Sequence, residues 1–191
     1  FIATVLENHD HVDILINNAG RSIRRSVQYS FNRFHDYERT MQLNYFGAVR
    51  LIMGFAPRML ERSSGHIINI SSMTATQAIT RVPGYSTAKA AVDLFTKWLA
   101  VEVALKFGEH IRVNAIAPGF FVTDQNRALL TTPDGGYTER AATVIRKSPF
   151  GRFGEADELV GTCIWLCADA SRFVTGTIIP VDGGFSAWSG V

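Results

Sequence analysis

Four short apolar runs, separated from one another by longer segments of helical pattern, constrain the fold of this chain more than any other feature. Runs of this length and composition are typical of strands that are buried on both faces. Strands that alternate with helices indicate βαβ units, whose strands form a parallel sheet. The sequence therefore predicts an α/β fold with strands at residues 12–16, 66–72, 111–117 and 177–181.

The segments between the strands repeat apolar residues at helical spacing. Pro57 lies inside the first long one, where its ring should kink or locally end the helix. No internal repeat or linker divides the chain, so residues 1–191 should form one domain. The predicted helices cover residues 1–9, about 34–61, 84–107, 124–131, 138–147 and 156–169.

The composition is that of a globular protein, with 47% hydrophobic and 19% charged residues. The net charge is +2 and the basic residues form no long run, which argues against nucleic acid or a membrane surface as a partner. No apolar run approaches the roughly 20 residues that cross a bilayer. Because no secretory signal opens the chain, we expect a cytoplasmic protein.

Two cysteines, Cys163 and Cys167, are four residues apart in a helical segment and should share one face of it. They could form a metal or redox pair, but no histidine or second cysteine pair stands nearby to complete a site. We therefore favour two buried thiols and expect no metal.

The strongest chemical signal is the segment YSTAK, from Tyr85 to Lys89. Residues four apart on a helix face the same way, and a nearby ammonium favours the phenolate form of tyrosine. A tyrosine with a lowered pKa could exchange a proton near neutral pH, whereas free tyrosine does so poorly. Taken alone, the pair is weak, because such spacings arise often by chance on amphipathic helices.

Small or polar residues follow three of the predicted strands and strengthen the interpretation. Ser72 ends the second strand, thirteen residues before Tyr85. Asn17 to Gly20 follow the first strand, and Ala117 to Gly119 follow the third. Ligands of parallel α/β sheets gather at the carboxyl ends of the strands, so these segments should line one crevice.

The chain resembles the short-chain dehydrogenase/reductase family, and the resemblance covers nearly its whole length. The matching motifs occur in the family's order, which makes the resemblance highly specific. They are LINNAG (15–20), LNYFG (43–47), INISS (68–72), YSTAK (85–89), IRVNAIAPGFFVT (111–123), GRFGEADELVG (151–161) and FVTGTIIPVDGGF (173–185).

The resemblance implies a Rossmann-like, doubly wound parallel sheet and an NAD(P)-dependent oxidoreductase that moves a hydride between nicotinamide and a carbonyl or secondary alcohol. Tyr85 would be the general acid/base, and Ser72 would hold the substrate oxygen. Lys89 would lower the tyrosine pKa and bind the nicotinamide ribose. Asn44 would anchor a water that links Lys89 to solvent.

The same resemblance implies which residues bind the cofactor, NAD being slightly preferred over NADP. Tyr85 and Lys89 would contribute from the catalytic side. Near the adenosine and ribose the residues would be Asn17, Ala19 and Gly20, and near the nicotinamide carboxamide Pro118, Gly119, Phe121 and Thr123.

One part of the family pattern is absent. The sixteen glycines include no G-x-G pair, so the glycine-rich loop that binds the cofactor pyrophosphate cannot occur in this chain. The first residue is Phe1, and four of an expected seven strands are visible. We therefore expect an N-terminally truncated domain, part of a longer protein, whose strand at 12–16 would be a bare apolar edge.

The two halves of the chain suggest different substrates. Residues 21–70 resemble reductases of lipid-like or acyl substrates, and residues 76–191 resemble the D-mannonate oxidoreductase (fructuronate reductase) branch. A sugar acid is preferred, because the segment after the third strand usually shapes the family's substrate pocket. Gln125, Asn126 and Arg127 would suit a polyhydroxy acid, although they could equally be surface residues.

Two further alternatives remain open at this stage. A 3-oxoacyl or generic ketone reductase is the second enzyme hypothesis, and a non-catalytic fragment or scaffold is the hypothesis of another class. The helices at 34–61 and 84–107 match those of the family's dimer face, and the last strand and tail match a second interface. The resemblance therefore implies a homodimer or homotetramer. It also implies a small-molecule substrate.

Overall fold

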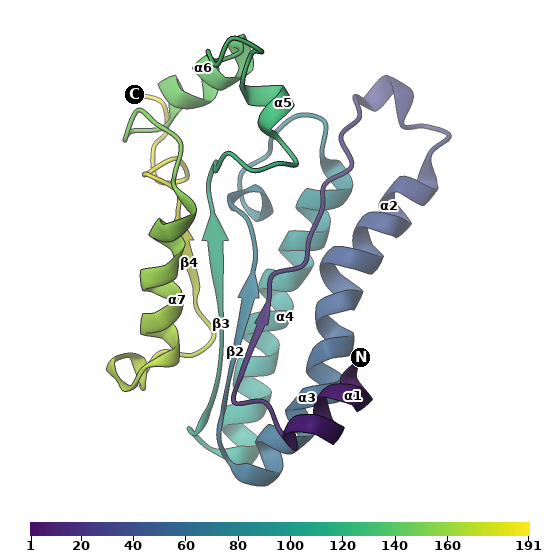
Figure 1. The fold of residues 1–191 in the computed structure, drawn as a ribbon, viewed down its shortest axis with the longest axis vertical. Helices are drawn as coiled ribbons and strands as arrows, with labels where there is room; N and C mark the ends of the chain where they lie inside the picture. Colours follow the sequence, from purple (N-terminus) through teal and green to yellow (C-terminus); the bar gives the residue numbers. More distant parts are fainter.

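The computed structural model describes all residues, 1–191, and contains one four-stranded parallel sheet (Figure 1). The strand order is that of the chain, and each strand lies within three residues of its predicted position at either end. The prediction of a parallel α/β sheet is therefore confirmed. The strands are β1 (Ile14–Asn17), β2 (Gly65–Ile70), β3 (Ile111–Pro118) and β4 (Ile178–Val181).

Helices cover both faces of this sheet, as a doubly wound fold requires. Helices α3 and α4 pack on one face and α7 on the other (Figure 1). The remaining turns of helix are short 3-10 segments, apart from one π-helical turn at Gln42–Phe46. The α-helices are α1 (Ile2–His9), α2 (Phe34–Met41), α3 (Gly47–Arg62), α4 (Pro83–Phe107), α5 (Arg127–Leu130), α6 (Glu139–Lys147) and α7 (Val160–Cys167).

One prediction about the helices is wrong in part. Helix α3 continues through Pro57 and ends at Arg62, so the proline does not end it. Phe55 and Met59, on either side of the proline, are almost fully buried in the main core. We infer that their packing holds the helix across the lost hydrogen bond, which costs a few kcal/mol in an isolated helix.

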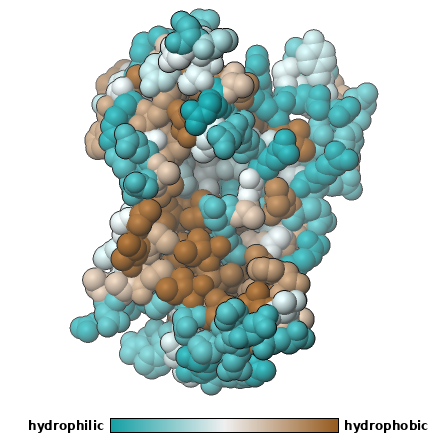
Figure 2. Space-filling view, viewed as in Figure 1, coloured by the Kyte–Doolittle hydropathy of each residue, from teal (hydrophilic) through white to brown (hydrophobic).

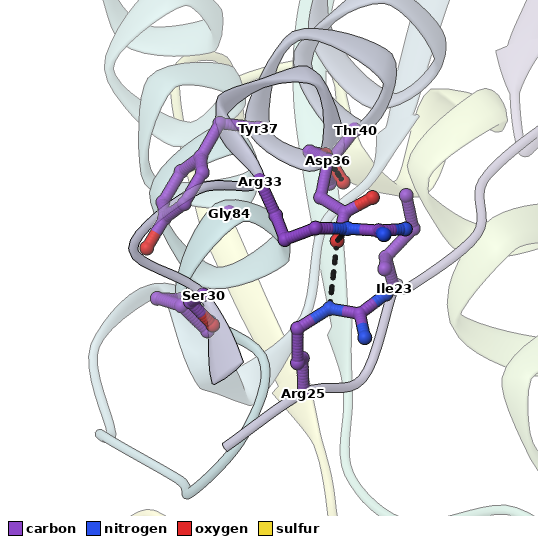
Figure 3. A pocket seen from close by; sticks show the side chains of 9 residues that line it. Ile23, Arg25, Ser30, Arg33, Asp36, Tyr37, Thr40 and Gly84 are labelled. Atoms are coloured by element: carbon purple, nitrogen blue, oxygen red, sulfur yellow. Dashed lines mark hydrogen bonds and ion pairs between the residues drawn. The ribbon is translucent and has the colours of Figure 1, made fainter. Parts of the chain in front are cut away.

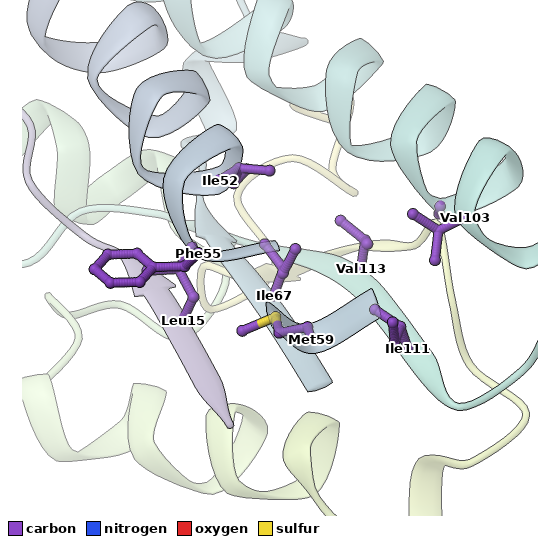
Figure 4. Close-up of a cluster of buried hydrophobic side chains, with 9 residues drawn as sticks. Leu15, Ile52, Phe55, Met59, Ile67, Val103, Ile111 and Val113 are labelled. Carbon is purple, nitrogen blue, oxygen red and sulfur yellow. The ribbon is translucent and has the colours of Figure 1, made fainter. Parts of the chain in front are cut away.

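The main hydrophobic core lies between the sheet and helices α3 and α4 (Figure 4). Side chains alternate along a strand, so Leu15 and Ile67 face this core while Ile68 faces the opposite side. There Ile68 and Ile116 pack with Leu166 of α7. Cys163 and Cys167 are free, half-buried thiols that pack against this second cluster.

Strand β1 is the edge of the sheet, as predicted. Its residues alternate, with Leu15 and Asn17 buried and with Ile14 and Ile16 45% and 46% exposed. In Figure 2 hydrophobic atoms gather over the sheet, on the face that carries α7. An exposed apolar edge of this kind favours pairing with another strand. None of the helices combines the length and the apolar character of a membrane-spanning helix.

Candidate active site

The parallel sheet brings the predicted site residues to one end of the molecule. Asn17 and Asn69 are register partners at the ends of β1 and β2, and Ile70 pairs with Ile116 of β3. Ser72 lies two residues after the end of β2, and Tyr85 lies in the first turn of α4. The ends of three strands and the start of one helix therefore surround the same space.

Lys89 is the most deeply buried charged side chain of this site, with 3% of its surface exposed. Its ammonium group donates a hydrogen bond of 2.7 Å to the carbonyl of Ile70 and lies 5.5 Å from the centre of the Tyr85 ring. Burial lowers the pKa of Lys89 to about 8, and the carboxylate of Asp93, one helical turn away, opposes this shift. An ammonium has three donors, so two remain for a ligand or water.

Ser72 and Tyr85 lie close enough to interact. The Ser72 hydroxyl accepts hydrogen bonds from the backbone N–H and the hydroxyl of Thr74, at 3.2 and 3.1 Å, which fix its position. Burial raises the pKa of Tyr85, and the Ser72 side chain partly opposes this rise. The direction differs from the predicted lowering by Lys89, because the ammonium bonds the Ile70 carbonyl and burial of the phenol dominates.

Asn44 lies in the π-helical turn and is almost fully buried. Its amide donates to the carbonyls of Arg21 and Thr40, at 2.8 and 2.9 Å, and its Oδ1 accepts from the Arg21 N–H at 3.2 Å. These bonds tie the helix to the segment that follows β1. A π turn inside an α-helix frequently marks a functional site, and the sequence did not indicate this one.

Gly20 shows how closely these parts approach one another. A Cβ atom at this position would lie 2.8 Å from Asn44 Oδ1 and 3.3 Å from Lys89 Nζ. Only glycine therefore allows the backbone to pass between the two side chains. Gly20, Asn44 and Lys89 form one cluster, although they come from three segments of the chain.

A buried chain of hydrogen bonds links the strand ends to α4, and sequence reasoning missed most of it. Asn17 Nδ2 donates to Asn69 Oδ1 at 2.8 Å, Asn69 Nδ2 donates to Thr96 Oγ1 at 2.9 Å, and Thr96 bonds the Val92 carbonyl. Asn17 Oδ1 is buried without a partner. In the sequence, the sign of this network was Asn69, a polar residue in the middle of an apolar strand.

A cavity of about 440 Å³ opens beside this network. Asn17, Ala19 and Asn44 line it together with apolar side chains such as Ile16 and Leu51. A dinucleotide needs a space with apolar walls and a few polar groups, and this cavity has both. The unpartnered Asn17 oxygen at this cavity and the two spare donors of Lys89 fit a nicotinamide cofactor.

The segment after β3 is held tightly against the C-terminal part of the chain. At Gly119 a Cβ atom would lie 2.6 Å from Asp182 Cα, and the Gly119 N–H donates to the Val181 carbonyl at 3.0 Å. Phe121 forms a β-bridge with Gly154. The backbone of Pro118 to Thr123 thus follows a fixed path at the end of β3.

The polar residues proposed for a sugar acid have other tasks in the structure. Asn126 accepts from the Thr123 N–H and donates to the Phe121 carbonyl, both at 2.8 Å, so it shapes the turn. Arg127 is exposed and lies 3.8 Å from Asp124. Gln125 contacts only the Ser22 carbonyl, at 3.4 Å. Asn126 therefore has a structural role, and Arg127 is an exposed residue near Asp124.

A small pocket next to the start of α4 is also structural (Figure 3). Arg25 Nε lies 2.9 Å from Asp36 Oδ2 in it, and this interaction lowers the pKa of the Asp36 carboxyl. The ion pair fastens residues 21–26 to α2. Gly84 completes the wall, since a Cβ there would lie 3.4 Å from the Tyr37 ring.

Comparisons with known proteins agree with this geometry. The family described as enoyl-(acyl carrier protein) reductase matches residues 1–186. An uncharacterized oxidoreductase of Haemophilus influenzae is 44% identical over 197 residues, which cover 94% of this chain and 67% of that protein. A fatty acyl-CoA reductase of Acinetobacter baylyi is 58% identical over 99 residues, which cover 52% of this chain and 34% of that protein.

Solved structures with the same fold carry cofactors. A candidate D-mannonate oxidoreductase from Haemophilus influenzae with bound NAD has a TM-score of 0.87 and 42% identity, over 99% of this chain and 72% of that one. A gluconate 5-dehydrogenase from Burkholderia cenocepacia, in complex with NADP and tartrate, has a TM-score of 0.88 and 33% identity, over 98% and 69%. The chain thus spans about seven tenths of each.

Proposed function

Because this chain belongs to the short-chain dehydrogenase/reductase family of NAD(P)-dependent oxidoreductases, we propose that Ser72, Tyr85 and Lys89 handle the proton that accompanies hydride transfer at a carbonyl or secondary alcohol. The observation that carries the proposal is the buried Lys89 ammonium, which lies 5.5 Å from the centre of the Tyr85 ring, while the Ser72 side chain is close enough to Tyr85 to oppose the rise of its pKa.

The proton chemistry follows from the environment of each group. In the reductive direction the Tyr85 hydroxyl, whose raised pKa keeps it protonated at neutral pH, donates its proton to the carbonyl oxygen. The Ser72 hydroxyl donates a hydrogen bond to the same oxygen. The Lys89 ammonium stabilises the phenolate that forms, and Asn44 anchors a water between Lys89 and solvent. The cofactor supplies the hydride.

The cofactor contacts that we propose follow the same geometry. Lys89 holds the nicotinamide ribose with its free donors, and Tyr85 borders the nicotinamide. The unpartnered oxygen of Asn17 and the backbone of Ala19 and Gly20 receive the adenosine side. The carboxamide is held by the segment after β3, through Pro118, Gly119, Phe121 and Thr123. NAD is slightly preferred, since the NAD-bound structure has the higher sequence identity of the two, 42% against 33%.

We propose a sugar acid of the fructuronate or mannonate type as the substrate. The similarity to a candidate D-mannonate oxidoreductase and to a gluconate 5-dehydrogenase supports this class. The second candidate is an acyl substrate, which the 58% identity to a fatty acyl-CoA reductase over 99 residues favours.

A substrate panel separates these candidates. The protein would be given NADH or NADPH together with D-fructuronate, a 3-oxoacyl thioester or a neutral ketone, and oxidation of the cofactor would be followed. Fastest turnover of fructuronate supports the sugar-acid proposal. Fastest turnover of the thioester replaces it with the acyl reductase. No hydride transfer to any carbonyl, with saturating cofactor bound, refutes the function.

We also propose that the protein acts in the cytoplasm as a homodimer or homotetramer. Leu94, Trp98, Val101 and Leu105 form a stripe along α4 and are 55–80% exposed. An apolar stripe of this size is typical of an interface. Light scattering should give a mass of two or four chains, and a monomer at micromolar concentration would contradict the proposal.

A further inference from the structure

A second, larger pocket lies next to the candidate active site, with a volume of about 840 Å³. Residues 77–81, which connect Ser72 to Tyr85 along the chain, form one wall. Phe120, next to Gly119, and residues of α6 and the C-terminal segment form the others. Gln77 bonds the Ser186 carbonyl at 3.4 Å across it. The pocket is therefore bounded by the loop that joins Ser72 to Tyr85 and by the segment that follows β3.

Positive charge dominates the lining of this pocket. It includes Arg24, Arg81, Arg140 and Lys147, and the only carboxylate is that of Glu139. None of the four cations takes part in an ion pair, although seven contacts between an arginine or lysine and a carboxylate occur elsewhere, including Arg25 with Asp36. Four cations therefore line one pocket without a carboxylate within salt-bridge distance.

The burial of Arg24 makes this arrangement costly. Its Nε–H is buried and has no hydrogen-bond partner. Burial lowers the pKa of Arg24, and the like charges of Arg140 and Arg81 lower the pKa further, so the three side chains are close enough to repel. Arginine does not lose its proton in proteins. An anion that entered the pocket would remove both the repulsion and the unmet donor.

Arg81 adds backbone strain at the same place. Its φ is 73°, in the left-handed region that costs a non-glycine residue about 1–2 kcal/mol. The Arg81 carbonyl accepts a hydrogen bond of 2.8 Å from the Arg25 N–H, which links the two arginine-bearing segments. Strained residues cluster at functional sites, where the surrounding structure holds them in place.

We propose that Arg24, Arg81 and Arg140 form an oxyanion-binding subsite that holds the carboxylate or phosphate group of the substrate. This inference rests on the proposed function, because it assigns the pocket to the same substrate. Guanidinium groups bind carboxylate and phosphate through paired hydrogen bonds. The aromatic side chains of Phe120, Phe185 and Trp188 line the same pocket and would contact the uncharged part of the substrate.

Calorimetric titration tests the subsite without any hydride transfer. The probes are D-gluconate, inorganic phosphate and coenzyme A, with D-glucitol as the neutral match for gluconate. We expect one or more of the anions to bind, and Arg24→Gln and Arg140→Gln each to weaken that binding about tenfold or more, as the loss of a charge-assisted hydrogen bond predicts. Binding of gluconate alone would identify the substrate as a carboxylate, whereas binding of coenzyme A or phosphate would identify it as phosphorylated.

The control is Arg172→Gln, which removes an exposed arginine without an ion pair on another part of the surface and should leave anion binding unchanged. Equal binding by Arg24→Gln, Arg140→Gln and wild type overturns the subsite, and so does binding of none of the three anions. Weakening by Arg127→Gln in place of these variants would return the role to the segment after β3. Thermal unfolding of each variant checks its fold, and Arg24→Gln should not lower the Tm, because it removes a repelled charge.

The two proposals fail separately. Tyr85→Phe should retain gluconate binding and lose carbonyl reduction. If reduction survives in Tyr85→Phe, the proposed role of Tyr85 as proton donor fails, whatever the titration shows. If reduction is lost but the arginine variants bind anions normally, only the subsite fails.

Discussion

Replacing Lys89 by methionine should make the protein more stable at neutral pH. The ammonium is 3% exposed, and burial lowers its pKa from 10.5 to about 8. A shift of this size corresponds to a cost of about 3 kcal/mol for folding with the charge in place. Loss of the hydrogen bond to the Ile70 carbonyl costs about 1 kcal/mol in return. Lys89→Met should therefore gain about 2 kcal/mol at pH 7.

The gain should depend on pH in a defined direction. The folded-state pKa of Lys89 lies below the unfolded value, so between about pH 8 and 10.5 the unfolded chain binds more protons. The wild-type protein therefore becomes more stable relative to the variant as the pH rises through this window. Below pH 8 the cost of the charge is fully present, and above 10.5 it has vanished.

Urea unfolding of both proteins at a series of pH values between 7 and 10.5 measures this difference. The matched control is Lys97→Met, an exposed lysine on the same helix, which should leave stability within about 0.5 kcal/mol. The reasoning is refuted if Lys89→Met is the less stable protein at pH 7, or if its advantage is the same at every pH. If Lys89→Met is more stable than wild type but inactive, the Lys89 charge lowers the stability of the fold and is kept for function.

Two further substitutions, each with a control elsewhere in the chain, test the packing around Lys89. Asn44→Ala removes three hydrogen bonds of the π turn, so it should lower the free energy of unfolding, measured in urea, by about 1–3 kcal/mol. The control is Asn8→Ala on the exposed helix α1, which should change the free energy of unfolding by less than about 0.5 kcal/mol. Gly20→Ala should lower the Tm, because its Cβ would meet Asn44 Oδ1 at 2.8 Å. The control is Gly161→Ala in α7, where nothing lies within 4 Å of the added Cβ, and it should raise the Tm because alanine favours helix. A higher Tm for Gly20→Ala than for wild type would contradict the close approach of Asn44 to Gly20.

The sheet and the position of Ser72, Tyr85 and Lys89 at its end could be predicted because they depend on local patterns. Apolar runs mark buried strands, and the parallel topology then sets the strand ends together. The spacing of Tyr85 and Lys89 needs only a regular helix. Ser72 needs only its place after β2. These features follow from the order of residues, with little contribution from distant contacts.

Other features arise from contacts between distant segments, which no local pattern contains. The π turn depends on the bonds between Asn44 and Arg21, 23 residues apart. The raised pKa of Tyr85 depends on how deeply the folded chain buries the phenol. Helix α3 passes Pro57 because the core holds it.

The arginine pocket was missed for the same reason. Arg24, Arg81 and Arg140 are scattered in the sequence, and only the fold collects them. Sequence reasoning looked for a carboxylate partner at Arg127, in the segment after β3. That residue proves to be exposed, near Asp124.

The account depends most on Tyr85 as the proton donor, and one measurement tests it directly. Wild type and Tyr85→Phe would be given nicotinamide cofactor deuterated at the transferable position and the best carbonyl of the substrate panel, and deuterium in the alcohol product would be measured by mass spectrometry. We predict labelled product from wild type and a rate at least about 100-fold lower from Tyr85→Phe, in line with the loss of a general acid. Equal rates of labelling by the two proteins would contradict the account.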